Sequence, residues 1–146
     1  MVSLNRDEIL NTIPHRDPFV WIDEVVELSE TQIKARKFLD PDLEVFAGHY
    51  PRFPVLPGVL QCEAAFQAGA VLITKCQPLT EGHVPVVTRL NNVKFRRMIR
   101  PGETMDLDVE LNERHLNAFF LSGKVSVDGE VATRLDFACA TAEVEL

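Results

Sequence analysis

The chain is poor in cysteine and has no long apolar run. Its three cysteines, Cys62, Cys76 and Cys139, form no CxxC spacing. An odd, dispersed set does not fit a disulfide framework, so we expect a reducing compartment and a cytoplasmic protein. The N-terminus lacks the apolar stretch of a signal peptide, and the longest apolar run, around Val71, is too short and interrupted to span a bilayer. We expect neither secretion nor membrane insertion.

The chain also lacks a surplus of positive charge. Its formal net charge is -7, which argues against general affinity for nucleic acid but leaves room for a local basic patch. The 146 residues, 46% of them hydrophobic and 25% charged, are typical of a soluble globular protein. We expect one domain over residues 1–146, because a cofactor domain plus a substrate domain would need a longer chain.

Recognisable metal and phosphate motifs are absent as well. The sequence has no four-ligand metal spacing, no Gly-rich phosphate loop and no nucleophile elbow. We therefore expect no metal site.

The apolar patterns predict several strands. Residues 19–28 and 31–39 read as two strands joined tightly at Ser29-Glu30, and residues 105–112 alternate apolar and polar side chains as a strand with one wet face does. A short helix is predicted after Asn5, with acidic residues in its first turn.

A hairpin and one long helix complete the pattern. Asp128-Gly129 separates two alternating runs and favours a two-residue turn, because both central residues need positive φ. The long helix begins at Pro57 or Gly58 and lasts to about Lys75, and residues 80–83 read as a loop. One hydrophobic helix between strand-rich halves is satisfied most simply by an antiparallel sheet curled around it. This is an α+β arrangement, the hotdog fold.

The long helix carries one ionisable group in an apolar setting. Glu63 is the only charged residue between Gly58 and Thr74, and Gln67 shares its face four residues later. Burying an unpaired carboxylate costs on the order of 5 kcal/mol, so such a group has a partner, keeps its proton or takes part in chemistry. The alternatives are a partly exposed carboxylate at a helix edge or a buried one tied structurally to an arginine.

His49, in a proline-rich loop just upstream, is a candidate partner. Three prolines among residues 48–58 fix φ, so we expect a stiff loop that holds the imidazole in place. A histidine near its ordinary pKa accepts a proton at neutral pH, and a buried Glu63 keeps one, because desolvation disfavours the ionised form. Taken alone, His49 also fits a loop histidine bonded to backbone.

The two groups together suit a 1,2-elimination. A base removes a proton beside an activated carbonyl while an acid protonates the departing hydroxyl. The free N–H groups of Gly58 and Val59 are candidates for polarising that carbonyl, because a helix N-terminus favours developing negative charge.

Several short motifs follow one another along almost the whole chain. They are Ile13-Pro14-His15-Arg16-Asp17-Pro18-Phe19, Gly48-His49-Tyr50-Pro51, Pro54-Val55-Leu56-Pro57-Gly58-Val59-Leu60, residues 63–67, Lys94-Phe95-Arg96-Arg97, Arg100-Pro101-Gly102-Glu103 and Val127-Asp128-Gly129. In this order they resemble the 3-hydroxyacyl-[acyl-carrier-protein] dehydratases of the FabZ type. The resemblance implies a hotdog enzyme of fatty acid or related acyl chain biosynthesis. It would convert a (3R)-hydroxyacyl thioester reversibly to the trans-2-enoyl thioester without metal or redox cofactor.

The resemblance also implies roles for particular residues. His49 would take the proton from C2, and Glu63 would deliver one to the C3 hydroxyl, directly or through water. These two would come from opposite protomers of a homodimer, and whether dimers form a trimer of dimers stays open. Gln67 would orient the carboxyl and Gly58 would face the thioester oxygen. Further substrate contacts would come from Val59, Tyr50 and Phe66.

Four positions depart from the family pattern. Tyr50 stands where Phe is usual, Arg52 where Gly is usual and Leu56 where Met is usual, while Phe66 replaces a smaller or more flexible apolar residue. We expect Arg52 and Phe66 to narrow or redirect the acyl tunnel, so that acyl length is left open.

A basic cluster stands out from the acidic chain. Its members are Lys94, Arg96, Arg97 and Arg100. Alone they would fit a solvated strand and turn. With the resemblance they predict a docking site for an acyl carrier protein, an acidic partner that carries the substrate on its phosphopantetheine arm.

Other candidates for chemistry are weaker, and two other functions stay open. Cys62 neighbours Glu63 but points about 100° away on a helix, so we interpret it as packing. His15 is interpreted as structural, and His83 and His115 as loop or strand-edge residues. The alternative functions are thioester hydrolysis on the same scaffold and non-catalytic binding of an acyl carrier protein or acyl chain.

Overall fold

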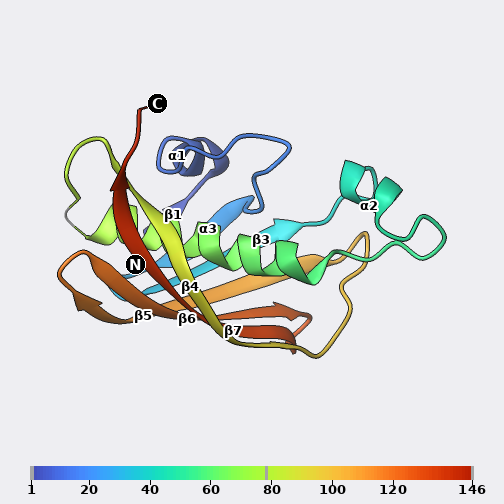
Figure 1. The fold of residues 1–146 in the computed structure, drawn as a ribbon. Helices are drawn as coiled ribbons and strands as arrows, with labels where there is room; N and C mark the ends of the chain where they lie inside the picture. Colours follow the sequence, from blue (N-terminus) through green and yellow to red (C-terminus); the bar gives the residue numbers. More distant parts are fainter. Residues whose placement is uncertain (1, 78, 146) are drawn as a thin grey trace.

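The computed structural model describes residues 2–77 and 79–145. These residues contain one antiparallel sheet with strand order β1-β2-β3-β5-β6-β7-β4 (Figure 1). The strands are β1 (Val2–Leu4), β2 (Glu24–Leu28), β3 (Gln32–Phe38), β4 (His83–Phe95), β5 (Thr104–His115), β6 (Ala118–Val127) and β7 (Glu130–Glu143). The helices are α1 (Arg6–Leu10), α2 (Glu44–Gly48) and α3 (Gly58–Cys76).

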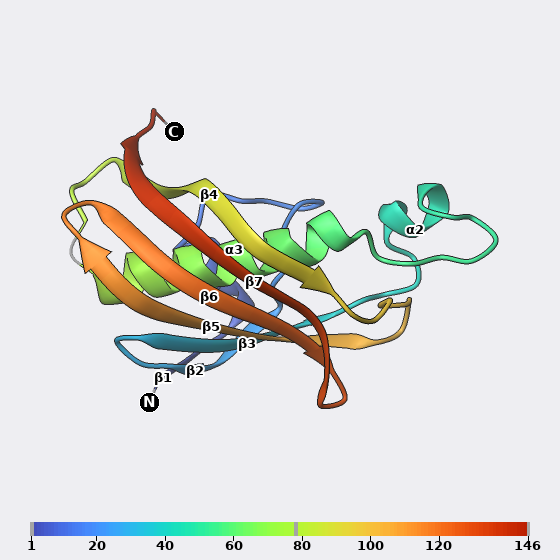
Figure 2. The same cartoon turned by 60° about the horizontal axis from the view of Figure 1, so that its bottom comes forward.

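Helix α3 lies against one face of the sheet and contacts β3, β4, β5, β6 and β7. Figure 2 shows the sheet in front with α3 behind it. Ala64, Ala68, Val71 and Leu72 are fully buried in this layer. At Gly69 the ring of Phe137 comes within 2.9 Å of the place a Cβ would occupy, so helix and sheet approach closely. An antiparallel sheet curled around one long hydrophobic helix is the hotdog fold, which confirms the predicted α+β class.

The hairpin between β6 and β7 forms at the predicted turn. Val127 pairs with Glu130, and the two residues between them have φ values of 50° at Asp128 and 80° at Gly129. Both lie in the left-handed region that a type I′ turn requires, and Asp and Gly tolerate that region better than other residues. The predicted helix after Asn5 also forms, with an Asn5 and Glu8 capping box at its start.

The predicted strand over residues 19–28 is only half right. Strand β2 begins at Glu24, because the backbone of residues 19–21 bonds to a side chain instead of a neighbouring strand. The Phe19 carbonyl accepts from Gln67, and the Trp21 N–H donates to Gln67. A distant buried amide thus takes the place of a strand partner. The short β1 and α2, and the extent of β4, were not predicted.

Strand β4 forms an edge of the sheet. It pairs with β7 on one side and ends the strand order on the other. Its apolar side chains Val86, Val87 and Leu90 are 39%, 39% and 43% exposed. An exposed edge with apolar side chains is suited to pairing with another chain. No helix in the described part of the chain is both long and apolar enough to cross a membrane.

Candidate active site

The loop after α2 fixes the orientation of His49. Its Nδ1 lies 2.8 Å from the carbonyl oxygen of Val55. Because a carbonyl only accepts, Nδ1 must carry the ring proton in this contact, which leaves Nε2 unprotonated in the neutral ring. The imidazole also stacks on Tyr50 with ring centroids 4.4 Å apart. His49 is therefore held in the tautomer that can act as a base through Nε2.

The N-terminus of α3 opens into the same cavity, which has a volume of about 610 Å³. Gly58, Val59, Gln61 and Phe95 line it together with His49. The first backbone N–H to bond to the Pro57 carbonyl belongs to Leu60, so the Gly58 and Val59 N–H groups are left for a ligand. Phe95 packs so closely on Gly58 that a Cβ there would lie 2.7 Å from the ring. A larger residue at this position would push the Phe95 ring away from the start of the helix.

Glu63 sits one turn further along α3, and its carboxyl is oriented by Gln67. The Gln67 Nε2 donates to Glu63 Oε2 at 3.0 Å and to the Phe19 carbonyl at 2.8 Å, while its Oε1 accepts from the Trp21 N–H at 2.8 Å. Gln67 is fully buried, so these three bonds fix its amide. Burial raises the pKa of the Glu63 carboxyl, and the bond from Gln67 opposes part of that rise. The Glu63 side chain is therefore a weaker acid, which keeps its proton to a higher pH than an exposed glutamate does.

Glu63 lines a second cavity, of about 280 Å³. Its walls are mostly apolar, formed by Phe66, Ala70, residues 84–87 and Cys139, with His15 as the other polar side chain. The ring of Phe66 is held edge-on against Phe137 at 5.1 Å. Of the two predicted catalytic residues, His49 lines the first cavity and Glu63 the second, so a single chain does not bring them into one pocket.

The predicted basic cluster is divided in the structure. Lys94 and Arg96 are exposed, and Arg96 lines the His49 cavity. Arg97 instead forms an ion pair with Glu103 at 2.7 Å, and the guanidinium of Arg100 lies 3.9 Å from the centroid of the Phe53 ring. Two of the four cations are thus engaged within the protein.

Two polar residues beside the cavities were not assigned a part in the chemistry from sequence: His15 was interpreted as structural, and Gln61 was given no role. His15 lies 3.7 Å from Glu63, and Gln61 is buried at the His49 cavity, where its Oε1 accepts from the Thr133 hydroxyl. The signal for Gln61 was a polar side chain on the apolar helix, and for His15 a histidine between prolines. Neither signal says which cavity a side chain faces.

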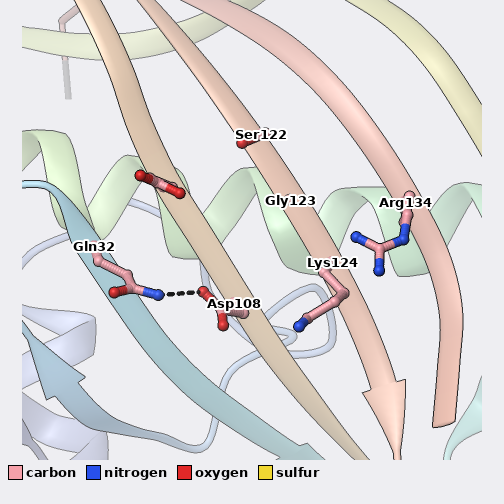
Figure 3. A pocket seen from close by; sticks show the side chains of 7 residues that line it. Gln32, Asp108, Ser122, Gly123, Lys124 and Arg134 are labelled. Carbon is pink, nitrogen blue, oxygen red and sulfur yellow. Dashed lines mark hydrogen bonds between the residues drawn. The ribbon is translucent and has the colours of Figure 1, made fainter.

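The remaining features have simpler explanations. A hollow of about 180 Å³ lies on the outer face of the sheet, and in it Gln32 donates to Asp108 at 2.9 Å. Figure 3 shows these two side chains with Lys124 and Arg134 on neighbouring strands. The mixed polar lining of the hollow is that of a solvated sheet face. Burial raises the pKa of the Cys62 thiol, and raises that of Cys139 to about 12, so neither is suited to nucleophilic attack. Residues 2–77 and 79–145 contain no group of three or more potential metal ligands.

The fold and the site define a hotdog protein with a weak acid on its central helix and an oriented imidazole at the start of that helix. The chain belongs to the FabA-like domain family, whose model matches residues 13–136. It is 35% identical to the 3-hydroxyacyl-[acyl-carrier-protein] dehydratase FabZ of Petrotoga mobilis, over 97% of this chain and 95% of the relative.

Solved structures agree with the fold. The dehydratase heterocomplex ApeI:P from Xenorhabdus doucetiae superposes with a TM-score of 0.74 at 16% identity, over 92% of this chain and 91% of that one. A thioesterase from Haemophilus influenzae superposes with a TM-score of 0.63 at 16% identity, over 82% of this chain and 78% of that one. Dehydratases and thioesterases thus share this architecture, so the likeness of fold does not choose between the two activities.

Proposed function

We propose that this protein dehydrates a (3R)-hydroxyacyl thioester, carried by an acyl carrier protein, to the trans-2-enoyl thioester in fatty acid or related acyl chain biosynthesis. The observation that carries the proposal is the complementary state of two groups. His49 is oriented by its Nδ1 contact with the Val55 carbonyl so that Nε2 is left to accept a proton, and burial raises the pKa of Glu63. An oriented base and a carboxyl that keeps its proton to higher pH than an exposed one are what an elimination requires.

Each group has one step in the proposed reaction. His49 Nε2 takes the proton from C2, the C2–H electron pair becomes the C2=C3 double bond, and the C3–O bond breaks. Glu63 gives its proton to the departing hydroxyl, which leaves as water. The N–H groups of Gly58 and Val59 stabilise the negative charge that develops on the thioester oxygen. Electrons are not transferred to or from the substrate overall, so the reaction calls for no redox cofactor.

The proposed site takes its acid and its base from two copies of the chain. In one copy His49 and Glu63 line different cavities. The free edge of β4 carries exposed apolar side chains next to both cavities, since residues 84–87 line one and Phe95 the other. Association of two copies along β4 would cover these side chains and join each His49 cavity to the partner's acid. We therefore propose a homodimer and leave higher assembly open.

An acyl carrier protein fits the surface beside the His49 cavity. Arg96 lines that cavity, and Lys94 precedes it on β4. Lys94 pairs across the sheet with Arg134, and Arg134 pairs with Lys124, so cations lie side by side on three neighbouring strands. Such a row favours an acidic partner whose phosphopantetheine arm enters at Arg96. The three free cysteines fit a cytoplasmic setting for this chemistry.

The test combines two inactivating variants. His49→Ala and Glu63→Gln should each lower the rate of enoyl thioester formation by at least about a hundredfold, while both proteins stay folded by circular dichroism. Mixing and refolding the two variants together should restore about a quarter of the wild-type rate, because half of the random dimers carry one intact site of two.

Other outcomes separate the alternatives. Full activity in either single variant would refute the proposed roles. If the mixture of the two variants regained no activity, a site shared between two copies would be refuted. Release of free thiol from an acyl thioester would identify a thioesterase, and binding without turnover, unaffected by His49→Ala, would identify a carrier-binding module.

A further inference from the structure

His15 stands beside Glu63 within the same chain. Its Nε2 lies 3.7 Å from Glu63 Oε2, and both residues line the 280 Å³ cavity. The side chains are only 28% and 23% exposed, respectively. Contacts of catalytic groups are often long in the absence of substrate and shorten when it binds. The proposed reaction gives His15 no role, so its contact with Glu63 is still to be explained.

The charge state of His15 follows from its surroundings. Burial lowers the pKa of the imidazole, and the positive charge of the adjacent Arg16 lowers it further. The Arg16 guanidinium itself donates to the carbonyl oxygens of Ile13 and His15 and stays beside the ring. Glu63 is the acidic group that faces the ring from α3. At neutral pH the ring is thus neutral and carries a single N–H.

The place of that proton is set by burial. His15 Nδ1 is buried and has no hydrogen-bond partner in residues 2–77 and 79–145; in that part of the chain only Trp21 Nε1 shares this condition among buried side-chain atoms. A buried N–H without an acceptor is rare, whereas an under-satisfied acceptor is better tolerated. The proton therefore belongs on Nε2, which faces Glu63 Oε2 at 3.7 Å.

Both donors approach the same oxygen of Glu63. Gln67 Nε2 and His15 Nε2 lie 3.0 Å and 3.7 Å from Oε2. We propose that His15 is a positioning residue that, together with Gln67, holds Oε2 as an acceptor and so leaves Oε1 to carry the catalytic proton into the cavity. This deepens the proposed dehydration and rests on it.

The proton count stays simple in this arrangement. In the elimination the O–H bond at Oε1 breaks and its proton leaves with the C3 hydroxyl as water, while the proton from C2 goes to His49. His15 keeps its own proton throughout. As the carboxylate forms, its negative charge draws the His15 N–H toward Oε2 from the observed 3.7 Å into hydrogen-bond distance, and this stabilises the transition state more than the ground state.

Two variants test this role. His15→Phe keeps an aromatic ring but removes the donor, and His15→Gln restores an N–H of similar reach. We expect kcat to fall about tenfold in His15→Phe with KM within twofold, and to return to within about threefold of wild type in His15→Gln. In His15→Phe the alkaline limb of the kcat profile should move to higher pH, because removing a donor to the carboxylate raises its pKa.

A second measurement does not depend on turnover. In ¹⁵N NMR spectra at neutral pH, His15 should show the Nε2-protonated tautomer, and its signals should follow the titration of Glu63 in the wild type but not in Glu63→Gln. A ring protonated at Nδ1, or a His15→Phe variant with unchanged kcat and pH profile, would overturn the proposal. If the wild-type protein gave the expected spectra but no dehydration, the proposed function would be refuted, while the interaction of His15 with Glu63 would stand.

Discussion

Replacing Gln67 by Leu tests the polar network behind Glu63. The Gln67 side chain is fully buried and makes three hydrogen bonds. It donates to Glu63 and to the Phe19 carbonyl, and it accepts from the backbone N–H of Trp21. Leucine has a similar volume, so the change leaves little empty space. The effect on stability therefore comes from hydrogen bonding.

The magnitude follows from the three bonds. The Trp21 N–H is left buried without an acceptor, which costs about 1–3 kcal/mol. The two bonds donated by the Gln67 amide are partly buried and contribute about 0.5–1.5 kcal/mol each. We expect Gln67→Leu to lower the free energy of unfolding by about 2–6 kcal/mol, a large share of the roughly 5–15 kcal/mol typical of a domain.

Gln61→Leu is the matched control. Gln61 lies on the same helix and is also buried, but its carbonyl has one hydrogen bond, from Thr133. We expect this variant to lose about 1–2 kcal/mol, measured like the first by urea unfolding followed by circular dichroism. A loss below about 1 kcal/mol in Gln67→Leu, or one no larger than in Gln61→Leu, would refute the reasoning.

Three further predictions concern charge and cavity size. Arg97 holds the pKa of Glu103 below its ordinary value of 4.5, so the ion pair stabilises the fold above that pH and loses its effect as pH falls through the lowered value. Glu103→Gln should cost about 1 kcal/mol at pH 7 in urea unfolding, and its difference from wild type should vanish in acid. Phe66→Ala should favour acyl chains two methylenes longer by about 15-fold in kcat/KM, since each buried methylene contributes about 0.8 kcal/mol; an unchanged chain-length profile would place the end of the tunnel elsewhere. Lys94→Glu should raise KM about fivefold for a carrier-linked substrate and leave a small-thiol substrate unchanged, whereas equal effects on both would argue against docking there.

The sequence was sufficient for elements with strong local signals. Asp128-Gly129 determines its hairpin because the turn geometry depends on those two residues alone. The predicted strand starts too early because the backbone of Phe19 and Trp21 bonds to Gln67, which is distant in sequence and belongs to a helix. When a side chain takes the place of a strand as the backbone's hydrogen-bond partner, the alternation of apolar and polar residues does not reveal it. That the chain forms one domain stays a prediction.

The candidate site was predictable in composition but not in arrangement. Glu63 and His49 are singled out as candidates because a carboxylate on an apolar helix and an imidazole among prolines are both unusual, and their catalytic roles stay predictions. The sequence does not show that they line two different cavities, because this depends on how the loop that carries His49 packs against α3, which carries Glu63. The pairing of Arg97 with Glu103, and the contact of His15 with Glu63, are tertiary and carry no sequence signal of their own.

Helix α3 explains why one short chain shows two incomplete sites. Gly58 and Gln61 lie three residues apart on the face that lines the His49 cavity, and Glu63 and Phe66 lie three residues apart on the face that lines the other. Two residues along a helix turn the side chain by about 200°, so Gln61 and Glu63 point to opposite sides. One helix therefore lines two different cavities, and in the proposed reaction one side would bind the thioester and the other would carry the acid. In the proposed dimer, two copies would bring these faces together and complete both sites at once, so that the half-buried acid of one chain would gain the imidazole of the other as its base.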